Sequence, residues 1–151
     1  MKNELLTFLA ILFAVIIGGA AEELLPKFAG VGVPVLLSVC LVGATGKSVF
    51  ASGVLALASG VFEDALCGLP FFLSASYFLA GAALMRFGGV SRALAVLVYP
   101  CYQLWLAVWL KGLSGGIWGR LIVSVPIGCA TFCVVWAAST VFTRRYLIDE
   151  A

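Results

Sequence analysis

Apolar residues form long, nearly uninterrupted runs along the whole chain, separated by short polar segments. A run of about 20 apolar residues is long enough to cross the hydrocarbon core of a bilayer as a helix. Helices are expected because unpaired backbone groups are costly in hydrocarbon, and because the strict alternation of a barrel strand is missing. The predicted helices cover Leu5–Ala20, Gly32–Ala44, Val49–Leu66, Phe71–Met85, Ala93–Leu110 and Leu121–Phe142. The second run is short and requires Phe28–Val31 to complete it. The predicted fold class is therefore all-α, a polytopic membrane bundle of about six transmembrane helices.

The composition indicates that lipid is the solvent of this chain. Of its 151 residues, 64% are hydrophobic and 11% are charged, and the mean hydropathy is +1.18. A soluble domain carries about 25% charged residues, so this chain has too few charges to cover a water-facing surface. Residues 1–151 are expected to form a single integral membrane domain in contact with the lipid bilayer.

The basic residues predict an orientation. The N-terminal run and the small residues that follow it imitate a secretory signal, but the later spans would insert regardless, so we expect the first helix to be retained. With the N-terminus inside, the cytoplasmic basic residues are Lys2, Lys47, Arg86, Arg92, Arg144 and Arg145, and the outer ones are Lys27, Lys111 and Arg120. This excess on one side favours two cytoplasmic termini. Because the basic residues are scattered, no nucleic-acid partner is expected.

Few residues suggest catalysis or cofactor binding. The segment GATGKS, Gly43–Ser48, imitates a phosphate-binding loop, but the position that requires the first glycine is Leu41, and a tight cytoplasmic turn at Lys47 is favoured. The chain has no histidine, which removes the commonest general base. No catalytic residues and no cofactor are therefore predicted.

The cysteines do not form a recognisable metal or disulfide pattern. Their number is odd, no two are spaced as CxxC, and all lie within or at the ends of apolar runs: Cys40, Cys67, Cys101, Cys129 and Cys133. We expect them to act as small apolar residues, and no metal site is predicted.

The third predicted helix carries a row of small residues that ends on an acid. Gly53, Ala56, Gly60, Asp64 and Gly68 recur at intervals of three or four residues and share one helix face. Small residues allow a neighbouring helix to approach closely, so Asp64 is expected to face protein rather than lipid.

Asp64 requires a partner, because it lies near the partly negative C-terminal end of its helix. The candidates are Lys27, Lys111, Arg120 and backbone N–H groups at the start of the next helix. Gly68 suits a helix C-cap, and Pro70 suits the first turn of the following helix. The segment 60–73 would then be a tight hairpin braced by Asp64.

Other polar or small positions allow more than one interpretation. Glu63 lies about 100° from Asp64 around the helix and is expected to face a headgroup or a partner. Ala10, Ala14 and Gly18 form a second small-residue row, for packing within the bundle or for docking another subunit. Two further polar residues, Tyr102 and Gln103, are expected to form hydrogen bonds between helices rather than a substrate site.

The segment from Pro34 to Ala80 resembles the rod shape-determining protein MreD family of the bacterial inner membrane. Pro34 opens an apolar helix, Gly53 and Gly60 follow in the next, and GVFEDALCGLPFF is similar to the family's G-x3-D-x3-G-x-P-L-G pattern through Asp64, Gly68 and Pro70. Phe72 departs from the pattern, since the family often has a second glycine there, and Glu63 is an addition.

The resemblance implies a six-helix bundle similar to the substrate-binding S components of energy-coupling-factor transporters. It also implies a non-enzymatic scaffold in cell elongation, bound to an MreC-like bitopic partner in a complex with MreB, RodA and a class B penicillin-binding transpeptidase. On this interpretation the structural or partner-interface candidates are Pro34, Gly53, Gly60, Glu63, Asp64, Gly68 and Pro70.

Two other functions are compatible with the residues. A vitamin- or metabolite-binding transport subunit would have an outward-facing cavity beside Glu63 or Asp64. A proton-coupled carrier or membrane enzyme would place Asp64 in a water-accessible cleft. The scaffold, by contrast, is expected to hold no small molecule.

Overall fold

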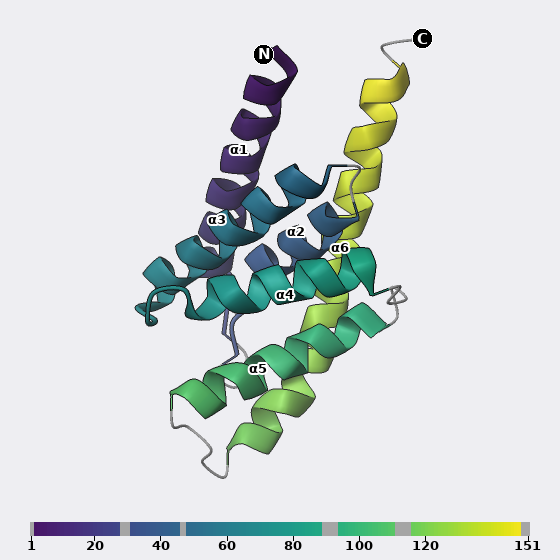
Figure 1. Ribbon diagram of the computed structural model, residues 1–151. Coiled ribbons are helices and arrows are strands. Elements are labelled where there is room, and N and C mark those ends of the chain that lie inside the picture. The colour runs from purple at the N-terminus through teal and green to yellow at the C-terminus, as the bar shows by residue number, and fades with distance from the viewer. Residues whose placement is uncertain (1, 28–30, 46–47, 89–93, 111–115, 149–151) are drawn as a thin grey trace.

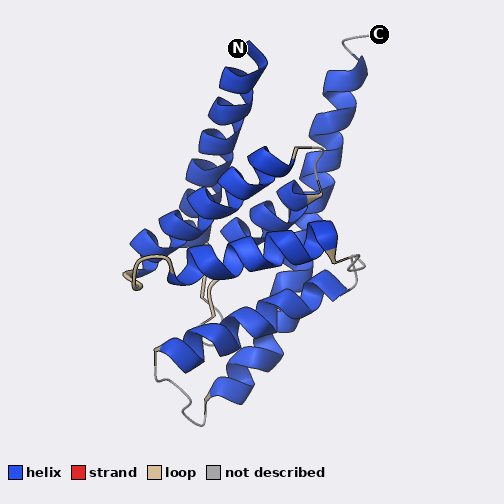
Figure 2. Ribbon diagram, viewed as in Figure 1, coloured by secondary structure: helices blue, strands red, loops and turns tan. Residues whose placement is uncertain are grey.

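The computed structural model describes residues 2–27, 31–45, 48–88, 94–110 and 116–148. In these residues the chain forms six α-helices joined by short connections, with one short 3-10 helix (Figures 1 and 2). The helices are α1 (Lys2–Leu24), α2 (Val35–Ala44), α3 (Val49–Cys67), α4 (Leu73–Phe87), α5 (Val98–Trp109) and α6 (Ile117–Ile148), and the 3-10 helix η1 is Leu94–Leu97. The predicted all-α helix bundle is confirmed.

Three helices are long and apolar enough to cross a membrane, as judged by length and composition. They are Leu6–Leu24 in α1, Val49–Cys67 in α3 and Ile117–Val141 in α6. Large apolar side chains on these helices are exposed, which lipid tolerates and water does not. The chain is thus a membrane protein. The other three helices are apolar but shorter.

The helix boundaries differ from prediction at several runs: α1 and α6 extend beyond the predicted Leu5–Ala20 and Leu121–Phe142, and the second and fifth runs are shorter or divided. The predicted Gly32–Ala44 helix begins only at Val35, directly after Pro34, and residues 28–30, which were expected to complete it, lie outside the described residues. The fifth run is divided into η1 and α5. Lys47, expected in a tight turn, also lies outside the described residues.

The core of the bundle lies around α2, which contacts α1, α3, α4 and α6. Its fully buried side chains include Leu36, Leu37 and Leu41, and they pack with Phe78 of α4 and Tyr99 of α5. The Ser38 hydroxyl of α2 and the Tyr99 hydroxyl are hydrogen-bonded at 2.8 Å. A short helix is therefore fixed in the bundle by apolar contacts on several sides and by a buried polar contact.

α1 begins and α6 ends at one end of the bundle, where both project beyond the other helices. The last turns of α1, α3 and α5 lie towards the opposite end (Figure 1). We call this opposite end the far end. Both predicted acid positions, Glu63 and Asp64, lie near it, in the last turns of α3.

Candidate functional site

The α3–α4 hairpin lies at the far end of the bundle. Gly68 ends α3 in the left-handed conformation (φ 61°, ψ 32°), and its N–H group donates to the Asp64 carbonyl. Glycine adopts this conformation without the steric cost that a side chain imposes. The prediction that Gly68 caps the helix is confirmed.

Asp64 bridges the hairpin through its side chain. Its Oδ1 atom accepts a hydrogen bond of 2.7 Å from the backbone N–H of Ser74, in the first turn of α4, and the residue is only 2% exposed. Of the predicted partners, the structure thus selects the backbone of the next helix. The residue that precedes α4, Phe72, has no capping side chain, so Asp64 supplies from α3 the acceptor that an N-cap residue would normally provide. The positive end of the α4 dipole offsets the unfavourable position of this acid at the end of α3.

The hairpin packs tightly at Gly60. A Cβ atom at this position would lie against the Ala75 Cα atom and 2.6 Å from the Ala75 backbone nitrogen. The α3 and α4 backbones are therefore in contact, as the small-residue row predicts. Gly53 behaves differently, because a Cβ atom there would meet nothing within 4 Å. The described residues therefore show no close packing at Gly53, since α4 diverges from α3 towards that end (Figure 1), and a role at a partner interface stays a prediction.

The turn between the two helices also corrects a prediction. Pro70 does not occupy the first turn of α4, which begins at Leu73; its carbonyl accepts from the Leu73 N–H at 3.1 Å, within the turn. Phe72 is left-handed (φ 68°, ψ 8°), the only residue other than glycine with a positive φ in the described chain. A side chain in this conformation costs about 1–2 kcal/mol. The extra turn residues place Asp64 opposite Ser74.

Polar contacts continue from the start of α4 to α5. The Ser74 and Tyr102 hydroxyl groups are hydrogen-bonded at 2.7 Å, and the Trp105 indole N–H donates to the Leu73 carbonyl at 3.2 Å. The predicted interhelical hydrogen bond of Tyr102 is confirmed. We call Asp64, Ser74, Tyr102 and the Leu73–Trp105 pair the latch.

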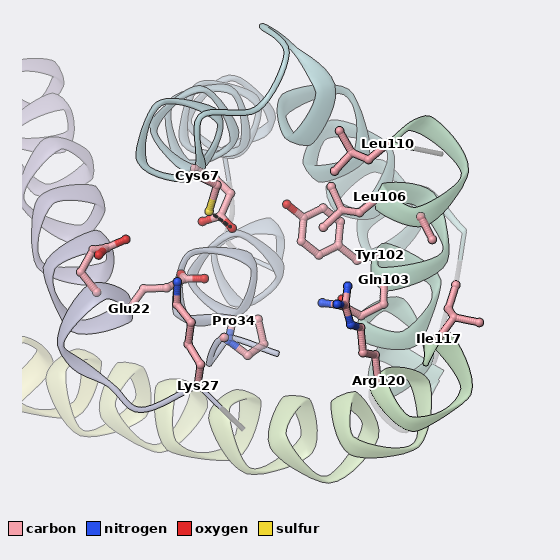
Figure 3. A pocket seen from close by; sticks show the side chains of 14 residues that line it. Glu22, Lys27, Pro34, Cys67, Tyr102, Gln103, Leu106, Leu110, Ile117 and Arg120 are labelled. Atoms are coloured by element: carbon pink, nitrogen blue, oxygen red, sulfur yellow. Dashed lines mark hydrogen bonds between the residues drawn. The ribbon is translucent and has the colours of Figure 1, made fainter. Parts of the chain in front are cut away.

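Glu63 faces a different environment from its neighbour. It lines a pocket of about 250 Å³ between α1, α3, α5 and the start of α6, and it is 6% exposed (Figure 3). Its Oε1 atom accepts from the Cys67 thiol at 3.6 Å, but its Oε2 atom is buried and has no hydrogen-bond partner among the described residues. Glu63 was expected to face a headgroup or a partner, and it turns into this pocket.

A second acid in the pocket, Glu22, was missed by sequence reasoning. Its Oε2 atom accepts from the Leu36 N–H at 3.0 Å, so it fixes the end of α1 to the start of α2, and its carboxyl group also interacts with that of Glu63. The signal available in the sequence was the pair Glu22–Glu23 at the outer end of the first span, matching Glu63–Asp64 at the outer end of the third.

The opposite wall of the pocket carries basic and amide groups. Gln103 and Arg120 line it side by side, with Glu22 across the cavity, whereas Lys27, which follows α1, lies on the side of Glu22 (Figure 3). Gln103 was expected to join helices by hydrogen bonds, and it is found at the pocket instead. The pocket is therefore acidic on the side of α1 and α3, and basic on the side of α6.

The cysteines differ in their exposure. All five cysteines are free, and only Cys40 is buried, so the expectation that they act as small apolar residues stays a prediction for the four exposed ones. Among the described residues there is no group of three or more His, Cys, Asp or Glu side chains placed to hold a metal ion.

The small-residue row of α1 is only partly packed within the bundle: Gly18 packs against Leu36 of α2, whereas Ala10 is exposed.

Comparisons with family models, with characterised proteins and with solved structures find no match to this chain. A function must therefore be inferred from the latch and the pocket.

Proposed function

We propose that the chain is a non-enzymatic scaffold of the bacterial cell-elongation complex, similar in role to MreD. It would lie in the cytoplasmic membrane with both termini in the cytoplasm and bind an MreC-like bitopic protein. Through this partner it would join MreB, RodA and a class B penicillin-binding transpeptidase during side-wall peptidoglycan synthesis.

The observation that carries the proposal is the backbone of Phe72. The family pattern often has glycine at this position, and in this chain the position is left-handed, a conformation that favours glycine. A pattern taken from the sequence and a dihedral angle taken from the structure therefore agree on the shape of the turn. Asp64, Gly60 and Gly68 also fall at the contacts that shape the same hairpin.

The proposed orientation is supported by the common end of the termini. α1 begins and α6 ends at the same end of the bundle (Figure 1). Arg86, at the end of α4, donates to the Ala44 carbonyl at the end of α2, while Lys27 and Arg120 line the pocket at the far end. The uneven number of basic residues at the two ends then favours cytoplasmic termini.

The proposal is tested by purifying the tagged chain from its source bacterium in mild detergent and identifying what accompanies it. We expect an MreC-like protein with a single membrane helix and a large outer domain. Gly60→Ala should reduce its recovery, because the hairpin is displaced, whereas Gly53→Ala should not. Recovery of a clean monomer with no such protein would contradict the proposal.

A second candidate is favoured by one specific observation. The cavity at the far end lies beside Glu63, as expected for a metabolite-binding transport subunit. In that case the same purification should recover a membrane coupling subunit in place of the MreC-like protein. A carrier acting through Asp64 has less support, because Asp64 is 2% exposed and is not among the residues that line this cavity.

A further inference from the structure

The pocket combines a buried acid that has one unpartnered oxygen with a wall of opposite charge. Burying a carboxylate is costly unless a cation or hydrogen-bond donors compensate it. Glu63 Oε2 has no hydrogen-bond partner among the described residues, and a second acid, Glu22, interacts with Glu63 and would repel it when both are ionised. An ammonium group placed between these two carboxyl groups would compensate both.

The side chains of the opposite wall are suited to bind an anion. Arg120 is exposed at the start of α6 and lines the pocket with Lys27 and Gln103. A guanidinium group offers paired N–H donors that match a phosphate or carboxylate. The Gln103 side chain adds a neutral donor at the same place (Figure 3). A single ligand would have to satisfy an acidic and a basic wall at once.

The size and depth of the pocket limit what can occupy it. Its volume of about 250 Å³ is below the range of about 300–1,000 Å³ typical of drug-sized ligands. Its lining comes from the ends of α1, α3 and α5 and the start of α6, which meet at the far end of the bundle. Helix ends of this kind lie at the level of lipid headgroups.

We propose that this pocket binds a small zwitterion, a group with a primary ammonium and a phosphate or carboxylate a few bonds apart. The ammonium donates to Glu63 Oε2 and to Glu22, and the anionic group accepts from Arg120 and Gln103. This chemistry is found in the headgroup of phosphatidylethanolamine and in soluble aminophosphates or amino acids. The inference does not depend on the partner proposed above, because a scaffold and a transport subunit could both carry such a site.

The test uses the full chain, purified and stripped of lipid in detergent. One arm titrates it with O-phosphoethanolamine by calorimetry. The other adds equal amounts of phosphatidylethanolamine, phosphatidylcholine and phosphatidylglycerol and counts bound lipids by native mass spectrometry. Phosphatidylcholine lacks the N–H donors and phosphatidylglycerol lacks the cation, so both should be retained about tenfold less.

Variants with matched controls test whether each wall of the pocket contributes to binding. Glu63→Gln should weaken binding of the probe by about tenfold. The control Glu4→Gln, an equal charge change 18 positions before Glu22 on α1 and about 27 Å from it, should change binding less than twofold. Arg120→Gln should also weaken it about tenfold. Its control, Arg144→Gln, lies 24 positions along the same helix, about 36 Å away. Circular dichroism and gel filtration check that each variant is folded.

The outcomes separate the sources of the ligand. Selective retention of phosphatidylethanolamine without binding of O-phosphoethanolamine supports a lipid headgroup, and binding of O-phosphoethanolamine supports a soluble ligand. No binding in either arm, or full binding by folded Glu63→Gln, would overturn the inference. Co-purification of an MreC-like protein would be unaffected by that failure, so the two proposals can fail separately.

Discussion

Glu63 and Asp64 are adjacent in sequence, yet they belong to two different parts of the molecule. Asp64 lies in the latch, where its Oδ1 atom accepts from the start of α4. Glu63, about 100° further around α3, lies in the pocket, where its Oε2 atom has no partner among the described residues. Both side chains are buried, and each has one oxygen without a hydrogen-bond partner among the described residues, Glu63 Oε2 and Asp64 Oδ2. The distinction is that Asp64 is bonded to the backbone of α4 and lies outside the pocket, whereas Glu63 lines the pocket.

Removing each acid in turn should have very different effects on stability. Asp64→Ala should lower the free energy of unfolding by about 3 kcal/mol, because a buried, charged hydrogen bond is lost and the Ser74 N–H is left without an acceptor. Glu63→Gln should change it by less than about 0.5 kcal/mol, since it removes a charge that the fold leaves uncompensated. Both are measured by detergent-induced unfolding followed by tryptophan fluorescence. Equal losses would show that the two acids do not have separate roles.

The next largest effect is expected at Gly60. Gly60→Ala should lower the free energy of unfolding by about 2 kcal/mol, because the added methyl group meets the Ala75 backbone and separates α3 from α4. Gly53→Ala on the same helix face should be neutral or stabilise the helix by up to about 1 kcal/mol. The two variants are compared in the same unfolding assay, and a loss at Gly53 equal to that at Gly60 would contradict the close approach at residue 60.

Tyr102 belongs to both the latch and the pocket. Its hydroxyl group is hydrogen-bonded to that of Ser74, and the residue also lines the pocket. Tyr102→Phe should lower the free energy of unfolding by about 1 kcal/mol. In a double-mutant cycle with Ser74→Ala, the two losses should not add, since each variant breaks the same hydrogen bond. Strict additivity of the two losses would show that the hydrogen bond contributes nothing.

The smallest effect, and a stabilising one, is expected at Phe72. Phe72→Gly relieves the left-handed strain, whereas Phe71→Gly removes a similar exposed ring from a residue whose φ is not positive. The first variant should be more stable than the second by about 1 kcal/mol. Thermal unfolding of the two variants side by side gives this difference directly. Equal stability would remove the turn argument on which the proposed scaffold role depends.

The sequence predicted the latch better than the pocket, for a physical reason. The orientation of Asp64, the cap at Gly68 and the hairpin itself follow from helix periodicity and from the conformational preferences of nearby residues, which act over a few positions. The pocket depends on how α1, α5 and α6 are rotated against α3, and no local pattern specifies that rotation. Glu22 was missed because it lies 41 positions before Glu63, and only the packed structure brings the two together.

The same limit explains the errors within the hairpin. The small-residue row identified the correct face of α3, but the two helices touch at Gly60 and not at Gly53, because helices that cross are close over only part of their length. The start of α4 was predicted two residues too early, at Phe71 instead of Leu73, so Pro70 was assigned to the helix although it lies in the turn. A left-handed Phe72 is not an expected turn residue, and its presence lengthens the turn.

The bond from Asp64 to Ser74 has a consequence for biosynthesis. During translation, Asp64 is synthesised ten residues before Ser74, whose backbone N–H donates to it in the folded protein. Until then this helix would enter the bilayer with an uncompensated acid, at a cost of up to about 3 kcal/mol. We therefore expect the two segments to pass from the translocon into lipid together, as one inserted pair.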